Sequence, residues 1–585
     1  MITIRDFSFV YRETDAPTVS GVNLDIPKGA FVGITGPAGC GKSTLTYALN
    51  GIIPHCYPGD FYGSVQVDDL DTCEASLTDI SRVVGSVCQD IDSQMVSSIV
   101  EDEILYGLEN FGVPHSEIEE RVSEALNDMG IDELRDRSIA SLSGGQKQKV
   151  AIASILALQP RVLVLDEPTA ELDPASSLQV FELLERYARE HETTVVVVEQ
   201  KIALLARFAS QLVIMNEGRI VFADEPRCVL AHANELASLG VNCPRATTLI
   251  NRLGYGVCRN VEEARNMLAE ALPTPTHTAT MQVERLSSPT HTQPTVLEFR
   301  NVHASYDEGA PILRGVSFTI REGEFVAFAG TNGAGKSTTM RLANGLLKPD
   351  SGTVLVSGKP TTHLQTSELA QRVGFLFQNP DRQICCPTVR EELLFGFRAL
   401  KKDETEAAKR VDAIIEEFGF NPDDDPFLLN RGTRQLLALA SIVVLEPRVI
   451  ILDEPTTGLD YRECEKVMGI IRRLHASGTT VIMVCHDMEV VADFAERVIV
   501  MNEGCVIGDG PTFAMLRSEE TLQNAHMTPP QIVELSLTLP LARPDLANTA
   551  IARANTLDDM ANAIDDIRVN QSTPSHEPAT ERSPR

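Results

Sequence analysis

Two stretches of the sequence have the residue types and spacing that bind phosphate groups. Residues 36–43 (Gly-Pro-Ala-Gly-Cys-Gly-Lys-Ser) and residues 330–337 (Gly-Thr-Asn-Gly-Ala-Gly-Lys-Ser) share the pattern G-x-x-x-x-G-K-S. The glycines let backbone N–H groups wrap around phosphate oxygens, and the N-terminus of a following helix adds a favourable dipole. Lys42 and Lys336 can reach the β- and γ-phosphates, while Ser43 and Ser337 can ligate magnesium. We therefore predict two sites for a nucleoside triphosphate and Mg²⁺.

An acidic pair follows an apolar run in each half of the chain. Asp166-Glu167 comes directly after Val162–Leu165, and Asp453-Glu454 comes directly after Val449–Leu452. An aspartate at the C-terminal end of a parallel strand can hold the magnesium shell. The glutamate that follows suits a general base that orients and deprotonates the attacking water. The sequence thus predicts hydrolysis of the nucleotide.

The elements that must position these residues also occur twice. Phe9–Tyr11 corresponds to Ala304–Tyr306, and the phosphate loops and acidic pairs correspond in the same order, with an offset between 286 and 295 residues. Val32–Thr35 and Val326–Ala329 are expected to be short buried strands that enter each phosphate loop, with a helix after it. A repeat of this length indicates two whole domains of α/β fold.

The composition marks the boundaries between these domains. Two stretches, residues 273–280 and 287–295, are rich in proline and threonine, which is typical of a flexible linker, and residues 570–585 have the same character. The predicted segments are a first domain (1–226) with a helical extension (227–272), a linker (273–295), a second domain (296–511) with its extension (512–568), and a disordered tail (569–585).

Charge, hydropathy and cysteine spacing exclude several classes of protein. The net charge of −31 lowers the expectation of a nucleic-acid-binding surface, because phosphate contacts need basic residues. No apolar run approaches the roughly 20 residues that cross a bilayer, and the N-terminus lacks a signal-peptide pattern, so we expect a cytoplasmic protein. The twelve cysteines have irregular spacing and are expected to be reduced structural thiols.

The first half contains a motif that identifies a family. Residues 142–146 are Leu-Ser-Gly-Gly-Gln, which resembles the LSGGQ signature of ATP-binding-cassette (ABC) ATPases. In that family, two cassettes pack head to tail, and each ATP lies between the phosphate loop of one cassette and the signature of the other. The resemblance therefore implies an ABC-type fold: two tandem P-loop NTPase domains, each with a helical subdomain and a helical C-terminal extension.

The resemblance also assigns roles by position. It implies that Tyr11 and Tyr306 stack on adenine, that Gln89 and Gln378 contact magnesium and water, and that Asp173 and Asp460 communicate across the paired cassettes. It implies that His486 holds the γ-phosphate. The catalytic set is Glu454, His486, Gln378, Glu167, Gln89 and Gln200, and the magnesium set is Ser43, Gln89, Asp166, Ser337, Gln378 and Asp453. The remaining ATP-binding residues are Gly36, Pro37, Ala38, Gly39, Cys40, Gly41, Lys42, Thr44, Ser143, Gly144, Gly145, Gln146, Gly330, Thr331, Asn332, Gly333, Ala334, Gly335, Lys336, Thr338, Asn430 and Gly432.

The two halves depart from the family pattern at two places. Gln200 aligns without gaps to His486, and a glutamine cannot carry a positive charge or shuttle a proton. The second signature is Leu-Asn-Arg-Gly-Thr at residues 429–433, in which Arg431 adds bulk where the family has a glycine. In head-to-tail packing both departures fall on the site of Lys42. We therefore predict one consensus, hydrolytic site on Lys336 and one degenerate site that mainly holds ATP.

The segments after the two glutamines narrow the family. Gln378–Gln383 (Gln-Asn-Pro-Asp-Arg-Gln) and residues 107–114 (Gly-Leu-Glu-Asn-Phe-Gly-Val-Pro) resemble stretches of energy-coupling factor (ECF) transporter ATPases. Residues 236–244 and 527–536 resemble the C-terminal dimer-contacting segments of that group. The resemblance implies import of a vitamin or transition-metal ion, with a transmembrane coupling protein and a small substrate-binding membrane protein as partners. It places the chain at the cytoplasmic face of a cell membrane, in a bacterium.

Two alternatives stay open at this point. One is the ATPase subunit of another ABC importer or exporter. The other is a tandem ABC protein that acts on ribosomes or DNA without a transporter. The short, uncharged linker and the absence of zinc-ligand spacing in the sequence favour a transporter subunit.

Overall fold

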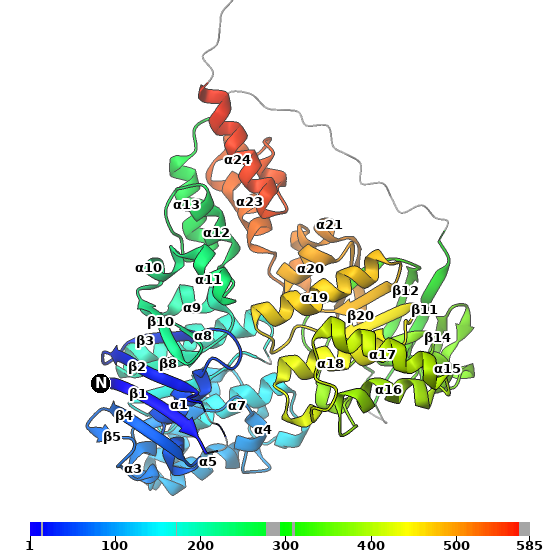
Figure 1. The fold of residues 1–585 in the computed structure, drawn as a ribbon. Coiled ribbons are helices and arrows are strands. Elements are labelled where there is room, and N and C mark those ends of the chain that lie inside the picture. The colour runs from blue at the N-terminus through cyan, green and yellow to red at the C-terminus, as the bar shows by residue number, and fades with distance from the viewer. Residues whose placement is uncertain (13, 15, 171, 276–292, 307–310, 573–585) are drawn as a thin grey trace, which may run out of the picture. The chain divides into compact units, whose positions relative to one another are not determined.

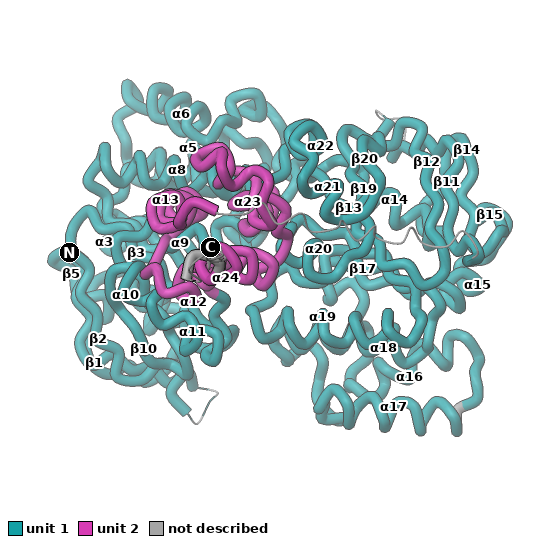
Figure 2. Tube along the Cα trace, turned by 90° about the horizontal axis from the view of Figure 1, so that it is seen from above, with its two compact units in different colours: residues 1–242, 291–528 teal, residues 243–290, 529–585 magenta. Residues whose placement is uncertain are grey.

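The computed structural model describes residues 1–275 apart from 13, 15 and 171, residues 293–306, and residues 311–572. The chain divides into two compact units, shown in different colours in Figure 2. Unit 1 contains residues 1–242 and 291–528, and unit 2 contains residues 243–290 and 529–585.

Unit 1 contains the same pair of sheets twice (Figure 1). Each half has a four-stranded antiparallel sheet and a six-stranded sheet that is parallel except for its last hairpin. The first four-stranded sheet has the order β2 (Val19–Ile26), β1 (Ile2–Tyr11), β4 (Gly59–Val67), β5 (Leu70–Asp71). The first six-stranded sheet has the order β10 (Arg219–Asp224), β9 (Gln211–Asn216), β3 (Phe31–Thr35), β8 (Thr194–Val198), β7 (Val162–Asp166), β6 (Val84–Val87).

The second half repeats this strand order. Its four-stranded sheet runs β12 (Leu313–Arg321), β11 (Thr295–Ala304), β14 (Ser351–Val356), β15 (Lys359–Pro360). Its six-stranded sheet runs β20 (Cys505–Pro511), β19 (Arg497–Asn502), β13 (Phe325–Ala329), β18 (Thr480–Val484), β17 (Val449–Asp453), β16 (Val373–Leu376). Every residue of β3, β7 and β8, and of β13, β17 and β18, is buried, because both faces of the sheet are covered. In the second half, one face packs on α18 (Arg431–Val443), α19 (Tyr461–Ala476) and α20 (Met488–Phe494), and the other shares a core with α14 (Lys336–Ala343) and the four-stranded sheet. The α/β fold with two tandem cassettes is confirmed.

The helices of unit 1 connect the strands and form a helical subdomain in each half. In the first subdomain α5 and α6 pack on α7, and in the second α16 and α17 pack on α18. The first-half helices are α1 (Lys42–Leu49), α2 (Ile52–His55), α3 (Leu77–Ser81), α4 (Ile91–Gln94), α5 (Val100–Asn110), α6 (His115–Met129), α7 (Gly144–Leu156), α8 (Pro174–His191), α9 (Ile202–Phe208), α10 (Pro226–Leu230) and α11 (Ala233–Leu239). The second-half helices are α14 (Lys336–Ala343), α15 (Thr366–Ala370), α16 (Val389–Ala399), α17 (Glu404–Phe418), α18 (Arg431–Val443), α19 (Tyr461–Ala476), α20 (Met488–Phe494), α21 (Thr512–Leu516) and α22 (Glu519–Asn524).

Unit 2 is built from both C-terminal extensions. Its helices are α12 (Arg245–Arg252), α13 (Val261–Ala271), α23 (Gln531–Ala542) and α24 (Leu557–Ser572). One apolar core contains residues from both segments, among them Leu249, Leu268, Leu535, Leu539 and Ile564. The two extensions that the sequence predicted as separate segments therefore share a core.

The domain bounds predicted from the sequence remain predictions, and the structure differs from them in four places. The first segment of unit 1 continues to Asn242, although the first extension was placed from residue 227. The second segment of unit 1 continues to Thr528, although the second extension was placed from residue 512. Strand β11 begins at Thr295, inside the predicted linker, and α24 continues to Ser572, inside the predicted tail. Most of the linker, residues 276–292, and the tail from 573 onward lie outside the described residues.

Two further expectations concern cysteines and membrane spans. All twelve cysteines are free thiols. Within the described part of the chain, no helix is both long enough and apolar enough to cross a membrane.

Candidate functional site

Each phosphate loop joins the central strand of a six-stranded sheet to a helix. The first loop leaves β3 and enters α1, and the second leaves β13 and enters α14. Gly36 and Gly330 have φ values of 151° and 137°, and an added Cβ would collide with the backbone carbonyl of Met215 or Met501. Only glycine fits these two positions, because the loop passes directly against the neighbouring strand.

The lysines of both loops are buried, and each spans its own loop. Lys42 Nζ donates to the carbonyls of Gly36 and Pro37, both at 2.8 Å. Lys336 Nζ makes the same contacts to Gly330 and Thr331, also at 2.8 Å. Burial lowers the pKa of Lys336, while Glu454, Asp453 and, more weakly, Asp173 favour its charged form. Each ammonium group thus lies where its loop can surround an anion.

The aspartates are the last residues of β7 and β17, next to the loop serines. Ser337 Oγ donates to Asp453 Oδ1 at 3.0 Å, and Ser43 hydrogen-bonds to Asp166. Burial raises the pKa of Asp453 to about 6, and the neighbouring Glu454 contributes. Burial also raises the pKa of Asp166. Two buried carboxylates whose charge is poorly compensated favour a cation beside them.

The two glutamates share an unusual backbone conformation. Glu167 has a φ of 51° and Glu454 a φ of 52°, in the left-handed region that residues other than glycine rarely adopt. Such strain persists only where the surrounding structure enforces it, and it is frequent at functional sites. Gln89 Nε2 donates to Glu167 Oε2 at 2.9 Å, and Gln378 Nε2 donates to Glu454 Oε2 at 3.0 Å.

The second residue after β8 and the second residue after β18 give these glutamates different surroundings. Gln200 Nε2 donates to Glu167 Oε1 at 2.7 Å, whereas His486 Nδ1 lies 3.6 Å from Glu454 Oε2. Burial raises the pKa of Glu167, and the buried carboxylate of Glu199 raises it further. Burial acts in the same direction on Glu454, but His486, together with Lys336 and Thr457, outweighs it, and the pKa of Glu454 lies below its usual value. We call Gln200 and His486 the switch positions.

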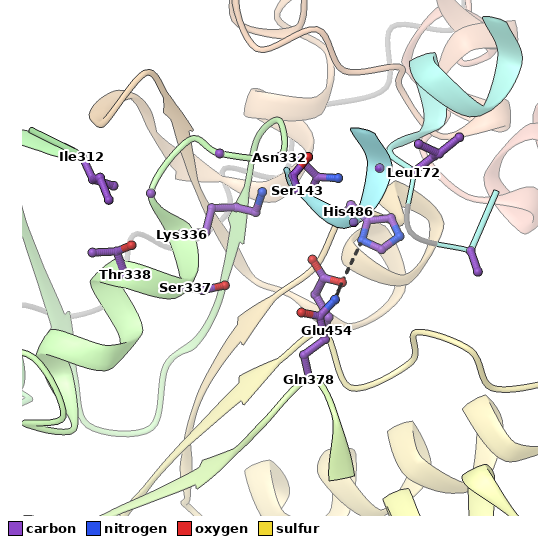
Figure 3. A pocket seen from close by; sticks show the side chains of 15 residues that line it. Ser143, Leu172, Ile312, Asn332, Lys336, Ser337, Thr338, Gln378, Glu454 and His486 are labelled. Atoms are coloured by element: carbon purple, nitrogen blue, oxygen red, sulfur yellow. Dashed lines mark hydrogen bonds and ion pairs between the residues drawn. The ribbon is translucent and has the colours of Figure 1, made fainter. Parts of the chain in front are cut away.

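The second phosphate loop and the first signature line the same cavity, which has a volume of about 330 Å³ (Figure 3). Glu454, Gln378 and His486 lie on one side of it, and Lys336 and Ser337 lie on the helix that follows the phosphate loop. The cavity is lined by Ser143, Gly144, Gly145, Ala170, Leu172, Ile312, Asn332, Gly333, Gly335, Lys336, Ser337, Thr338, Gln378, Glu454 and His486. The structure therefore places signature residues of one cassette beside the phosphate loop of the other.

A direct contact joins the first phosphate loop to the second cassette. The backbone N–H of Ala38 donates to Asp460 Oδ2 at 2.8 Å. Asp460 also begins α19, because its side chain accepts from the N–H of Glu463. Its counterpart Asp173 begins α8 in the same way, through Ser176. Among the described residues around the cavity, Asp173, Gln146 and Tyr306 do not line it.

The two signatures differ in how they cap their helices. Ser143 accepts from the N–H of Gln146, and the Gln146 side chain accepts from the N–H of Ser143, so α7 begins with a capping box. In the second half Asn430 accepts from the N–H of Thr433 at 2.8 Å, which preserves the cap of α18. An added Cβ at Gly458 would meet the guanidinium of Arg431, so that side chain packs against the loop after Glu454.

The tyrosines assigned to adenine lie beside the residue that follows each loop serine. Tyr11 Oη is 3.1 Å from Thr44 Oγ1, and Tyr306 Oη is 3.5 Å from Thr338 Oγ1. Tyr306 is 41% exposed, so its ring face is open to a ligand. The placement is compatible with base stacking at the edge of each phosphate site.

The residues present fit a nucleotide with Mg²⁺. Serine hydroxyl, aspartate carboxylate and glutamine carbonyl are oxygen ligands of the kind that Mg²⁺ takes. The glycine positions that exclude a Cβ and the buried lysines make a cradle for phosphate in both halves. We infer that Ser43, Asp166 and Gln89 would hold the ion in one half, and Ser337, Asp453 and Gln378 in the other.

Comparison with known proteins identifies the family. The ABC transporter family model matches residues 19–170 and 313–457. An ABC transporter ATP-binding protein of Caldanaerobacter subterraneus subsp. tengcongensis is 37% identical over 545 residues, covering 92% of this chain and 95% of its own. The chain belongs to the ABC transporter ATP-binding proteins. It is thus an ATP-binding subunit of the family of ATPases that couple hydrolysis to transport, as the sequence motifs predicted.

Two further relatives of this ABC ATPase are named for transport. An HMP/thiamine import ATP-binding protein of Bacillus subtilis is 34% identical over 545 residues, covering 91% of this chain and 96% of its own. The solved structure of cbiO1 from Clostridium perfringens, described as part of the ABC transporter complex cbiONQ, is 31% identical, with a TM-score of 0.37. It covers 43% of this chain and 98% of that one.

Sequence reasoning missed two residues of the first ABC cassette. Glu199 and Lys201 flank the switch position Gln200, and both contact the loop that follows Glu167. The gapless alignment of residues 193–200 with 479–486 pairs Glu199 with Cys485, and its continuation pairs Lys201 with Asp487. An alignment of the two halves could have drawn attention to Glu199, because an acidic residue there corresponds to a cysteine in the second half.

Proposed function

We propose that this chain is the ATPase subunit of an ECF-type importer and that its two ATP sites are unequal. The site around Lys336, Asp453, Glu454 and His486 is the main hydrolytic site. The site around Lys42, Asp166, Glu167 and Gln200 mainly holds ATP. The observation that carries this proposal is that His486 lies 3.6 Å from Glu454, whereas Glu167 accepts a hydrogen bond from the neutral amide of Gln200 and has the buried carboxylate of Glu199 nearby.

At the main site each side chain has a separate task. Glu454 accepts a hydrogen bond from Gln378 and faces His486, so an ionised carboxylate is held in place to orient a water. Lys336 and the backbone of the second phosphate loop bind the phosphates, and His486 donates to the γ-phosphate. Mg²⁺ bound at Ser337 and Asp453 would neutralise charge on the phosphate oxygens.

At the other site Glu167 is less suited to act as a base. Burial and the carboxylates of Glu199 and Asp166 raise its pKa, and the neutral amide of Gln200 donates to it where the main site has a histidine. The loss of one well-placed transition-state donor typically lowers the rate by about 10²–10³. This site retains Glu167, so we propose slow hydrolysis there.

The test compares Glu454→Gln with Glu167→Gln in steady-state ATPase assays of the full chain. We expect Glu454→Gln to abolish most turnover and Glu167→Gln to retain most of it. Equal losses from the two substitutions would refute the asymmetry.

The transport assignment rests on sequence. The segments Gln378–Gln383 and 107–114 resemble ECF ATPases, and the Bacillus subtilis relative is named for HMP/thiamine import. We propose import of a vitamin or transition-metal ion by a complex with a transmembrane coupling protein and a small substrate-binding membrane protein. The chain would bind them at the cytoplasmic face of the membrane as a peripheral subunit. Affinity purification from membranes should recover both proteins, and recovery with ribosomes would contradict the proposal.

A further inference from the structure

The residue after the first switch position makes contacts that its counterpart does not. Lys201 Nζ donates to the carbonyl of Thr169 at 2.9 Å, to the carbonyl of Leu172 at 3.4 Å and to Ser177 Oγ at 3.1 Å. These carbonyls belong to the loop after Glu167. We call the described residues Thr169, Ala170, Leu172 and Asp173 the first aspartate loop, and Thr456–Asp460 the second aspartate loop.

Glu199 also hydrogen-bonds to the first aspartate loop. It is 2% exposed and accepts from the Thr169 hydroxyl at 2.5 Å. The same carboxylate accepts from the N–H of Gln200 at 2.9 Å and from the N–H of Lys201 at 3.2 Å. The segment after β8 and the first aspartate loop are therefore joined by hydrogen bonds to charged groups, which are stronger than neutral ones.

The second cassette holds its aspartate loop by weaker contacts. The carbonyls of Thr456 and Leu459, which correspond to those of Thr169 and Leu172, accept from the Cys464 thiol, both at 3.8 Å. A thiol is a weak donor. Asp487, the counterpart of Lys201, instead caps α20 through the N–H groups of Glu489 and Val490. Thr457 of the second loop also donates to Glu454 at 3.1 Å, and the Arg431 guanidinium lies against Gly458. At the two corresponding carbonyls, however, the lysine of the first cassette is replaced by a thiol in the second.

The first aspartate loop forms part of the wall of the main site. Ala170 and Leu172 line the cavity that also contains Glu454 and His486 (Figure 3). Leu172 therefore makes two contacts. Its carbonyl accepts from Lys201, and the residue lines the cavity that contains the second phosphate loop. A shift in this loop changes the shape of the cavity around Glu454.

We propose that Lys201 is a positioning residue for the opposite ATP site: it fixes the first aspartate loop in the wall of the cavity around Glu454. The inference rests on the proposed function, in which the Glu454 site is the main hydrolytic one. Lys201, which follows Gln200 in the site of Glu167, thereby helps to set the geometry of the site of Glu454. In the described part of the second cassette, no lysine donates to the carbonyls of Thr456 and Leu459, which accept from Cys464 instead.

The experiment measures turnover of the Glu454 site alone. In full-length protein carrying Glu167→Gln, we expect Lys201→Met to lower kcat about tenfold, because a small misplacement of a site wall costs up to about 100-fold in rate. KM for ATP should change less than about twofold, since Lys201 does not line the cavity around Glu454. Lys201→Arg, which keeps a cationic donor, should recover about half of the parent kcat.

The matched control is Lys28→Met, which removes an exposed lysine paired with Glu192 in the same cassette. It should leave kcat unchanged. If Lys201→Met fails to fold, Lys201→Gln retains a neutral donor and should give a kcat between those of the Met variant and the parent. Unchanged kcat, a change in KM alone, or an arginine variant as slow as the methionine variant would overturn the proposal.

The result can be separated from failure of the proposed function. The asymmetry of the two sites is judged from Glu454→Gln and Glu167→Gln, without any change at Lys201. Even if that comparison shows no asymmetry, Lys201→Met must slow the turnover that the Glu167→Gln protein retains if Lys201 positions the wall of the Glu454 site.

Discussion

At the scale of single residues, the two candidate bases have one backbone conformation and opposite electrostatic surroundings. Glu167 and Glu454 have φ values within one degree, 51° and 52°. Their pKa values nevertheless shift in opposite directions. Burial, Glu199 and Asp166 raise that of Glu167, whereas His486, Lys336 and Thr457 together lower that of Glu454 against the effect of burial. The difference between the sites lies in the neighbouring side chains.

A histidine at the first switch position should therefore activate the slow site. In protein carrying Glu454→Gln, we expect Gln200→His to raise turnover about tenfold, since a cation near Glu167 favours the ionised carboxylate and the charge of the transition state. Phosphate release under saturating ATP measures the effect. The reciprocal control is His486→Gln in the Glu167→Gln protein, which should lower turnover. If Gln200→His gives no gain in turnover, the slow rate is caused by the altered signature at residues 429–433 instead.

A second prediction concerns the glycine that opens the second phosphate loop. Gly330→Ala places a Cβ against the carbonyl of Met501, so the loop must shift and ATP affinity at that site should fall more than about tenfold. Equilibrium binding of a fluorescent ATP analogue measures it. Gly478→Ala is the matched control, because Gly478 also has a positive φ (100°) but its Cβ would meet nothing within 4 Å. Similar losses from both would mean that backbone conformation, and not the clash, is decisive.

At the scale of elements, helix α18 retains its cap although the signature has changed. Asn430 accepts from the N–H of Thr433, as Ser143 accepts from that of Gln146 in α7. Asparagine and serine are both favourable N-caps, so the helix tolerates this exchange. The replacement alters what the signature presents to a ligand while it preserves the start of the helix.

Removal of that cap should loosen the first turn of α18. We expect Asn430→Ala to destabilise the turn by about 1 kcal/mol, and Asn430→Ser to have little effect. Hydrogen–deuterium exchange of peptides from Arg431–Val443 should then be about fivefold faster in the alanine variant. Equal exchange in the alanine and serine variants would show that Asn430 does not hold the helix start.

The sequence allowed the strands and loops around the phosphate sites to be predicted, because each is a short local pattern. The apolar runs at Val162–Leu165 and Val449–Leu452 are buried strands, and the aspartates stand at their ends. The contacts of Lys201 with Thr169 could not be predicted. They join residues that are distant in sequence, and a lysine after a strand usually lies in solvent. The roles of the site residues stay predictions until variants are measured.

At the scale of the whole molecule, the two C-terminal extensions form one unit. Helices α12 and α13 share a core with α23 and α24, although the second cassette separates them in sequence. The resemblance of residues 236–244 and 527–536 to dimer-contacting segments did not reveal that core, since apolar periodicity says which face is buried but not against which partner. Unit 2 therefore depends on residues from both halves of the chain.

Loss of a core side chain in α23 should therefore loosen α12 and α13. Leu539 is 0% exposed and Leu541 on the same helix is 81% exposed. We expect Leu539→Ala to cost about 2–5 kcal/mol and Leu541→Ala almost nothing. Limited proteolysis should cut residues 245–271 faster in the Leu539 variant only. Protection of that segment in the Leu539 variant would contradict a shared core.

The shared core of unit 2 also fixes when that unit can fold during synthesis. Helices α12 and α13 leave the ribosome before the second cassette, whereas α23 and α24 follow it. At about 5–20 residues per second, the apolar faces of the early pair wait on the order of tens of seconds for their partners. Unit 2 is thus completed only after both cassettes have been translated, and a nascent chain interrupted in the second cassette presents an uncovered apolar surface that chaperones and proteases recognise.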